Sequence, residues 1–299
     1  MTLRISLPAD FRYDEVLLYL NRNAQEPLHA VDAERRTVTK AFRGPRGPLL
    51  VRIAMAADGE LDVAFPLAEP DVTERAAATE YIAEWLDLGR DLAPFYRLAE
   101  KDPILRVVVP RYRGMRIVGV GDLFEALAWA IAGQQISLHV AYGLKKRLVE
   151  AYGDAVAFEG RDYWLFPEAA RIAGLAAEEL QALKFTRSKA AYLLGVAKLM
   201  DAGELSKSSL LAEGDLAAME RRLTAIRGVG KWTANYAVMR CLRHPDAFPL
   251  ADVGLHNALK LVLGLDSKPN LAEIERWAES WAGWRAYATF YLWRALTPS

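Results

Sequence analysis

The sequence predicts a mostly helical protein that begins with a small α+β domain. Short runs near the N-terminus alternate apolar and polar residues, as half-buried strands do, whereas the remaining chain repeats apolar residues at helical spacing. Pro66 and Pro70 lie where the first pattern gives way to the second. We therefore expect an α+β antiparallel-sheet domain at residues 1–72 and an all-helical domain at residues 73–299.

Within the first domain we expect one helix, DFRYDEVLLYLNRN at residues 10–23, beside a small antiparallel sheet. The segment AADGE at residues 56–60 contains an Asp-Gly dipeptide, which is typical of a hairpin turn. The expected strands are TLRISLP (2–8), RTVTKAFR (36–43), LLVRIAM (49–55) and LDVAFPL (61–67).

In the second domain, TERAAATEYIAEWLDL at residues 73–88 opens with Thr73 as an N-cap and has acidic residues in its first turn. Glycines or prolines punctuate many of the later helical runs, and no solenoid repeat is visible. These later runs lie at residues 122–133, 138–153, 176–184, 187–203, 215–226, 232–243, 253–264 and 271–296.

The composition excludes several kinds of site. Cys241 is the only cysteine in the sequence, which excludes an intramolecular disulfide framework and any Cys-rich zinc or iron–sulfur site. The histidines have no metal-binding spacing, so we expect no metal catalyst. No apolar run approaches the roughly 20 residues that span a bilayer, and the N-terminus lacks the apolar core of a signal peptide. We therefore expect a cytoplasmic protein.

The formal net charge is zero, from 38 basic and 38 acidic residues, which by itself argues mildly against nucleic-acid binding. The distribution of charge indicates the opposite, because residues 184–198 and residues 221–231 each carry four cations and no acid. A solvated helix face would explain one such run. Two runs, one of them on a glycine-containing bend, favour a surface that faces phosphates.

That bend is the pentapeptide RGVGK between two amphipathic runs. Gly228 and Gly230 permit positive φ and leave the backbone around Val229 uncovered by side chains. The next helix begins near Lys231, so its free N–H groups and positive dipole end face out of the bend, and Arg227 adds charge. Such a bend can bind a phosphate oxygen, although an ordinary turn between helices shares these features.

Apolar residues around the bend extend the pattern on both sides. It resembles the helix–hairpin–helix motif, hxxhxGxGxxxAxxxh, which binds DNA backbones without reading their sequence. The matching positions are Leu223, Ile226, Gly228, Gly230, Ala234 and Val238. This resemblance implies DNA as a partner but does not imply any particular chemistry.

Asp252 precedes an apolar helix and is expected to be its N-cap. Backbone N–H donors favour the anionic form of a carboxylate, and a fixed anion in a cleft can stabilise a cationic transition state. An aspartate twenty residues after Trp232, following the bend, resembles the HhH-GPD superfamily of base-excision DNA glycosylases. Three further segments resemble that family, so that the likeness covers most of residues 80–299: FEALAWAIAGQQIS (124–137), LKFTRSKAAYLLGVAKLMDAGEL (183–205, with Phe185 and Thr186 in place of the usual glycine) and WLDLGRDLAPFYRLAEKDPIL (85–105).

The resemblance also indicates a branch of the superfamily. Bifunctional members carry a lysine two residues after the second glycine of the bend, where this sequence has Trp232. Lys231 is adjacent, but one helical residue rotates a side chain by roughly 100°, so we expect Lys231 to face phosphate or solvent and the protein to be monofunctional. In the similar 3-methyladenine DNA glycosylase II (AlkA-like) branch, residues matching Trp232, Tyr236 and Trp293 line an electron-rich base pocket, although aromatics at helical spacing often only pack a core.

For this branch we expect excision of 3-methyladenine and 7-methylguanine from duplex DNA in base excision repair. The damaged nucleotide would leave the stack, Gln135 of the GQQIS turn would enter the gap, and Asp252 would stabilise the oxocarbenium-like sugar, orient the attacking water, or both. The resemblance implies a nucleoid-associated monomer that binds double-stranded DNA containing alkylated bases, without a membrane or a cofactor. It leaves room for a monovalent cation at the bend.

Two alternatives stay open. One is an 8-oxoguanine-type glycosylase/AP lyase of the same fold, in which Lys231 forms the covalent intermediate. The other is a non-catalytic helix–hairpin–helix DNA-binding protein, which would explain the glycines and cations but gives no reason for Asp252 or for the aromatic pair.

Overall fold

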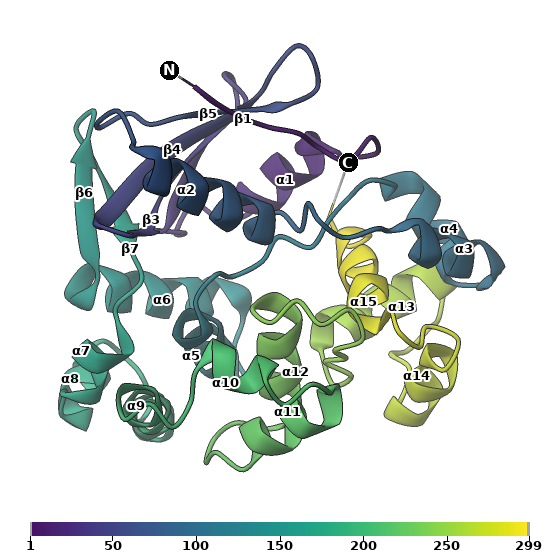
Figure 1. Ribbon diagram of the computed structural model, residues 1–299. Helices are drawn as coiled ribbons and strands as arrows, with labels where there is room; N and C mark the ends of the chain where they lie inside the picture. Colours follow the sequence, from purple (N-terminus) through teal and green to yellow (C-terminus); the bar gives the residue numbers. More distant parts are fainter. Residues whose placement is uncertain (1, 298–299) are drawn as a thin grey trace.

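The structure is a computed structural model that describes residues 2–297, and it has a sheet layer packed on a larger helical layer (Figure 1). This arrangement confirms the expected fold class, with an antiparallel sheet at the N-terminus followed by helices. The sheet is fully antiparallel in the order β1-β5-β4-β3-β2. Its strands are β1 (Leu3–Ile5), β2 (His29–Asp32), β3 (Thr37–Gly44), β4 (Gly47–Met55) and β5 (Leu61–Ala64).

Two helices cover the sheet, α1 (Tyr13–Leu20) and α2 (Val72–Trp85). On the covered face, Ile53 of β4 and Ile82 of α2 are almost completely buried in one apolar cluster. The core of the sheet layer therefore extends past residue 72 into α2. The N-cap of α2 is Asp71 in a reciprocal capping box, and not Thr73 as the sequence suggested.

The region after residue 72 is not all-helical, which corrects the prediction for residues 73–299. Strands β6 (Asp154–Phe158) and β7 (Arg161–Leu165) form a hairpin that rises beside the sheet layer (Figure 1). Its turn places Glu159 and Gly160 at positive φ, as a type I′ turn requires, but Glu-Gly is a weaker sequence signal than Asn-Gly. Tyr163 packs with Leu50 of β4, so contact with the remote sheet stabilises this hairpin. β2 was also not expected.

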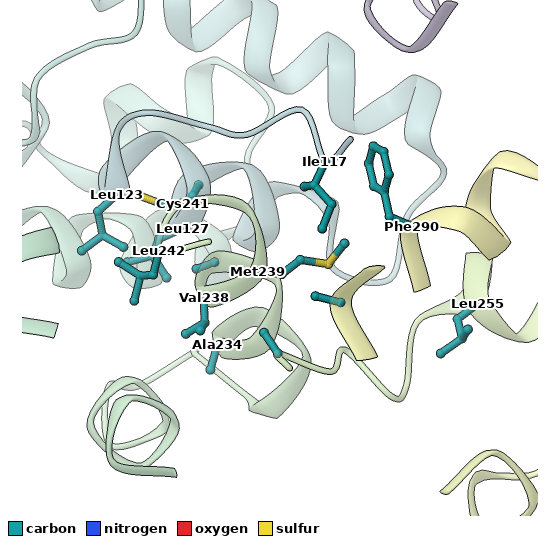
Figure 2. Close-up of a cluster of buried hydrophobic side chains, with 14 of the residues drawn as sticks. Ile117, Leu123, Leu127, Ala234, Val238, Met239, Cys241, Leu242, Leu255 and Phe290 are labelled. Carbon is teal, nitrogen blue, oxygen red and sulfur yellow. The ribbon is translucent and has the colours of Figure 1, made fainter. Parts of the chain in front are cut away.

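In the helical layer, α12 (Lys231–Arg240) packs against α5 (Leu123–Gly133), and their apolar side chains belong to one buried cluster with those of α13 (Val253–Leu263) and α15 (Arg285–Arg294) (Figure 2). The single helical run expected at residues 271–296 is broken into two helices, because Gly283 adopts a φ of +85° between them. None of the helices within residues 2–297 is long and apolar enough to cross a membrane. The helices are α3 (Ala93–Lys101), α4 (Leu105–Val108), η1 (Val109–Tyr112), α5 (Leu123–Gly133), α6 (Leu138–Tyr152), α7 (Ala169–Ala173), α8 (Ala177–Ala182), α9 (Arg187–Asp201), α10 (Lys207–Leu211), α11 (Leu216–Thr224), α12 (Lys231–Arg240), α13 (Val253–Leu263), α14 (Leu271–Ala278) and α15 (Arg285–Arg294).

Candidate functional site

Asp252 is the N-cap of α13, and its carboxylate is the meeting point of three helices. Its Oδ1 accepts a hydrogen bond from the backbone N–H of Leu255 at 2.8 Å, which satisfies one free donor of the first turn. Oδ1 also accepts from Nε1 of Trp293 at 2.8 Å, and Oδ2 accepts from Nε1 of Trp232 at 3.0 Å. Three N–H donors thus hold the carboxylate in one orientation.

The two indoles reach Asp252 from opposite directions in the sequence. Trp232 lies in the first turn of α12 and Trp293 near the end of α15, and both are partly exposed. Tyr236 stands between them, with ring centroids 5.7 Å from Trp232 and 6.5 Å from Trp293. The structure therefore brings the three predicted aromatic residues and the predicted carboxylate together.

Two further aromatic residues, which the sequence reasoning missed, complete this group. Trp129 of α5 and Tyr142 of α6 have ring centroids 4.7 Å apart and pack in one cluster with the three aromatics above. We call Trp129, Tyr142, Trp232, Tyr236 and Trp293 the aromatic cluster. Trp129 lies inside the segment FEALAWAIAGQQIS, but its apolar surroundings gave no sign that it would face a site.

Tyr236 is the most deeply buried of the three predicted aromatics, with 6% of its surface exposed. Burial raises its pKa to about 12, so the phenol remains protonated at neutral pH. Its oxygen accepts a hydrogen bond from Nη1 of Arg240 at 2.9 Å, which leaves the phenolic proton available for donation. Tyr236 can therefore offer both a ring face and an O–H donor.

The RGVGK bend has the geometry of an anion site at its C-terminal end. Gly228 adopts a φ of +89°, and a Cβ atom there would lie only 2.1 Å from the ring of Tyr192, so only glycine fits. Val229 is buried beneath the bend. Gly230 differs from the expectation, because its φ is −82°. It is an exposed N-cap without a side chain, and it leaves the first N–H groups of α12 uncovered.

The predicted cations divide into exposed and structural ones. Arg227 and Lys231 are exposed at the bend, and the Nζ of Lys231 lies 4.0 Å from a carboxylate oxygen of Glu220. Lys189 is buried and donates to the carbonyl of Ala132 at 2.7 Å, at the end of α5. The expectation that the whole run at residues 184–198 faces phosphates was therefore wrong for Lys189, whose role is to cap another helix.

The bend is tied to the turn between α5 and α6. Nε2 of Gln134 donates to the carbonyl of Gly228 at 2.9 Å and to Oγ1 of Thr233 at 3.1 Å. The next residue, Gln135, is exposed at a φ of +57°. Gln134 was not singled out from the sequence, yet it fixes the turn that carries Gln135 beside the bend.

The part of the chain that the structure describes contains no group of three or more His, Cys, Asp or Glu residues that could hold a metal ion. Cys241 is buried, and burial raises the pKa of its thiol to about 12. It does not contribute to the site.

Comparisons with known proteins find relatives along almost the whole chain. A family model described as HhH-GPD superfamily base excision DNA repair protein matches residues 128–283, and a model of the 8-oxoguanine DNA glycosylase N-terminal domain matches residues 23–127. The chain is 41% identical over 294 residues to a DNA-3-methyladenine glycosylase of Bacillus subtilis (strain 168), a match that covers 98% of this chain and 96% of that protein.

Two solved structures share the fold. The 3-methyladenine DNA-glycosylase from Archaeoglobus fulgidus superimposes with a TM-score of 0.81 at 22% identity, over 97% of each chain. The 8-oxoguanine glycosylase/lyase of Clostridium acetobutylicum, in complex with double-stranded DNA, gives a TM-score of 0.74 at 17% identity, over 98% of this chain and 96% of that chain. At these identities the likeness concerns the fold alone.

Proposed function

This chain belongs to the HhH-GPD superfamily of base excision DNA repair proteins, and we propose that it removes alkylated purines from duplex DNA as a monofunctional glycosylase. It is an N-glycosyl hydrolase whose partner is DNA. The observation that carries the proposal is the pair of hydrogen bonds that join Asp252 to the indoles of Trp232 and Trp293. They place a fixed negative charge at the edge of an aromatic surface.

The RGVGK bend supports binding to one DNA strand. The uncovered N–H groups at the start of α12 can donate to a phosphate, while the exposed Arg227 and Lys231 contribute charge that depends on salt concentration. Gln135, exposed beside the bend, is the residue we propose to fill the gap left by the flipped nucleotide. A monovalent cation at the bend stays a prediction from the resemblance.

The aromatic cluster supports recognition of the flipped base. Purines alkylated at N3 or N7 carry a positive charge, and each aromatic face attracts a cation by about 0.5–2 kcal/mol. An undamaged base lacks that charge, and its glycosidic bond is also harder to break. Attraction to the aromatic cluster and ease of departure from the sugar would then both favour alkylated purines over undamaged bases.

Asp252 would act on the sugar. When the C1′–N bond breaks, its electron pair moves to the departing base and neutralises it, while positive charge develops on the sugar ring. The carboxylate opposes that charge without moving, because three N–H donors already hold it. A water oxygen then bonds to C1′ and loses a proton, which leaves an abasic site and a free base.

Replacing Trp293 with phenylalanine separates the two roles of an indole. Phenylalanine keeps an aromatic face but removes the N–H that donates to Oδ1 of Asp252. We expect Trp293→Phe to lower kcat for base release by about tenfold with little change in KM, because the carboxylate loses one constraint on its orientation. Single-turnover kinetics on methylated duplex would measure this. A change in KM alone would show that Trp293 acts only as a binding surface.

The proposal as a whole is tested by mass spectrometry of bases freed from methylated duplex DNA. We expect 3-methyladenine and 7-methylguanine in the supernatant and an uncut strand that carries abasic sites. Borohydride should trap no covalent adduct, because Lys231 is 86% exposed and directed to Glu220 rather than to the aromatic cluster. An adduct that disappears in Lys231→Gln would contradict the monofunctional assignment, and binding without release would favour a non-catalytic DNA-binding protein.

A further inference from the structure

A cavity of about 60 Å³ adjoins the aromatic cluster between the sheet layer and the helical layer. Trp129, Tyr142 and Tyr236 line it on the side of the cluster. On the other side it is lined by Tyr19 of α1 and by Arg22, which follows α1. The sheet layer therefore contributes side chains to a space that is shared with the proposed base pocket.

The size of the cavity limits what it can hold. Its volume suits a few water molecules and is too small for a whole purine. A base whose rings lie against the aromatic cluster could place only its outer edge there. The groups that line the cavity would then meet the exocyclic atoms of the base.

The charges that line the cavity favour hydrogen-bond acceptors. Its two carboxylates, those of Glu26 and Glu125, are both paired with the ammonium group of Lys145, at 3.0 Å and 3.1 Å. Although burial acts to raise it, the charges of Lys145 and His29 lower the pKa of Glu26 to about 2. Within residues 2–297, Arg22 makes no ion pair with a carboxylate, so its charge is available to a ligand.

Arg22 is held in place through its Nε and its guanidinium plane, while its two terminal Nη groups make no hydrogen bond within residues 2–297. Its Nε donates to the hydroxyl of Tyr142 at 2.7 Å, and its guanidinium lies 4.0 Å from the ring centroid of Tyr19. Arg22 keeps exposed surface as a residue, although it lines the cavity and its guanidinium group is surrounded by protein atoms. Neither of its terminal Nη groups has a hydrogen-bond partner among the residues that the structure describes.

Tyr19, which lines the same cavity, carries a second spare donor. Its hydroxyl is buried and has no hydrogen-bond partner among residues 2–297. Buried polar groups are nearly always satisfied, so this hydroxyl lacks the partner that such groups usually have.

Resting on the proposed function, we propose that Arg22 and Tyr19 read the outer edge of the flipped base and favour 6-oxopurines over 6-aminopurines. A guanidinium can pair with both the O6 and N7 acceptors of guanine, and methylation at N7 leaves O6 as the acceptor on that edge. In 7-methylguanine the O6 oxygen remains an acceptor, whereas 3-methyladenine presents an N6 amino group, which is itself a donor. The donors of Arg22 and Tyr19 therefore match the first base and oppose the second.

The experiment measures both bases released from one methylated duplex by the full-length protein. Arg22→Met keeps the length and apolar stem of the side chain but removes its donors and charge. We expect it to lower the ratio of 7-methylguanine to 3-methyladenine released about tenfold, the discrimination of one good base contact. Arg22→Lys, which keeps the charge without the planar fork, should lower the ratio less. Arg35→Met is the matched control, because Arg35 is 80% exposed and pairs with Asp32 outside the cavity.

Tyr19→Phe gives a second measurement that does not depend on Arg22. It should lower the same ratio, and it should also raise the Tm, because it removes an unsatisfied buried hydroxyl. An unchanged ratio in Arg22→Met, or an equal fall in both products, would overturn the assignment while leaving the glycosylase proposal intact. Failure of the unaltered protein to release either base would overturn both.

Discussion

Asp252→Asn is expected to lower base release by about 10²–10³-fold, since an electrostatic group aimed at a developing charge contributes that much in other enzymes. Affinity for duplex DNA should be unchanged, because the phosphate contacts that we propose come from the bend rather than from the carboxylate. The reason for choosing asparagine is that it also forms a good N-cap, so α13 keeps its first-turn hydrogen bond. The change removes the negative charge with little change in shape.

Asparagine does alter the contact with Trp232, and the measurement of base release must allow for the resulting loss of stability. If its oxygen faces Leu255 and Trp293, its amide nitrogen faces the N–H of Trp232, so two donors meet. We expect a loss of stability of about 1–2 kcal/mol from this mismatch. Base release should therefore be measured well below the Tm, beside DNA affinity by fluorescence anisotropy. Activity within a few fold of the unaltered protein would reject Asp252 as the catalytic group.

The second large effect concerns stability. Asp87 is buried with 8% of its surface exposed, and its carboxylate lies 2.9 Å from Arg90 and 3.1 Å from Arg243. It also accepts from the hydroxyl of Tyr287 on α15. The cluster joins the chain after α2, the chain after α12 and the helix that carries Trp293. Its integrity therefore maintains the arrangement of the two indole-bearing helices.

We expect Asp87→Asn to destabilise the protein by about 3 kcal/mol, the lower end of the range for breaking a buried ion pair, because it leaves the partly buried guanidinium groups of Arg90 and Arg243 without their counter-charge. Asparagine tolerates the positive φ of +51° at this position, so backbone strain is not the cause. Urea unfolding would measure the loss. Glu84→Gln is the matched control, since its pair with Lys207 is exposed and should contribute less than about 1 kcal/mol.

The pH dependence gives a further check on Asp87. Burial acts to raise its pKa, but Arg243, Arg90 and the Tyr287 hydroxyl lower it below the usual carboxyl value. The contribution to stability is then fully present above the ordinary carboxyl range and is lost as the pH falls through the lowered folded-state pKa. The difference between the unaltered protein and Asp87→Asn should therefore shrink in acid. A difference that stays constant down to the acid transition would show that lost packing, and not lost charge, causes the destabilisation.

Several parts of the molecule followed directly from local sequence. The glycine bend requires Gly228 because the backbone there has a positive φ. Asp252 is the N-cap of α13. The i,i+4 spacing puts Trp232 and Tyr236 on one face of α12. Each of these features depends on residues within one or two helical turns. The register that turns Trp232 towards Asp252 while Lys231 stays exposed is equally local.

Other parts had no local signal. The β6–β7 hairpin carries a weak turn sequence, and its stability comes from packing on a remote sheet. Lys189 looked like part of a phosphate-facing run, but it caps the end of α5, a helix that lies far away in sequence. A cation count along one helix cannot show which side chains another helix will cover.

The motif, the cap and the aromatic spacing could be predicted from the residues alone, because hydrogen bonds and helical geometry fix them over a few positions. No local signal predicts that Trp293 donates to a carboxylate 41 residues away, or that Arg22 donates to Tyr142 across 120 residues. Such contacts depend on the angle and depth at which whole helices pack. Many residues set these jointly through the burial of their apolar faces, and no single segment encodes them.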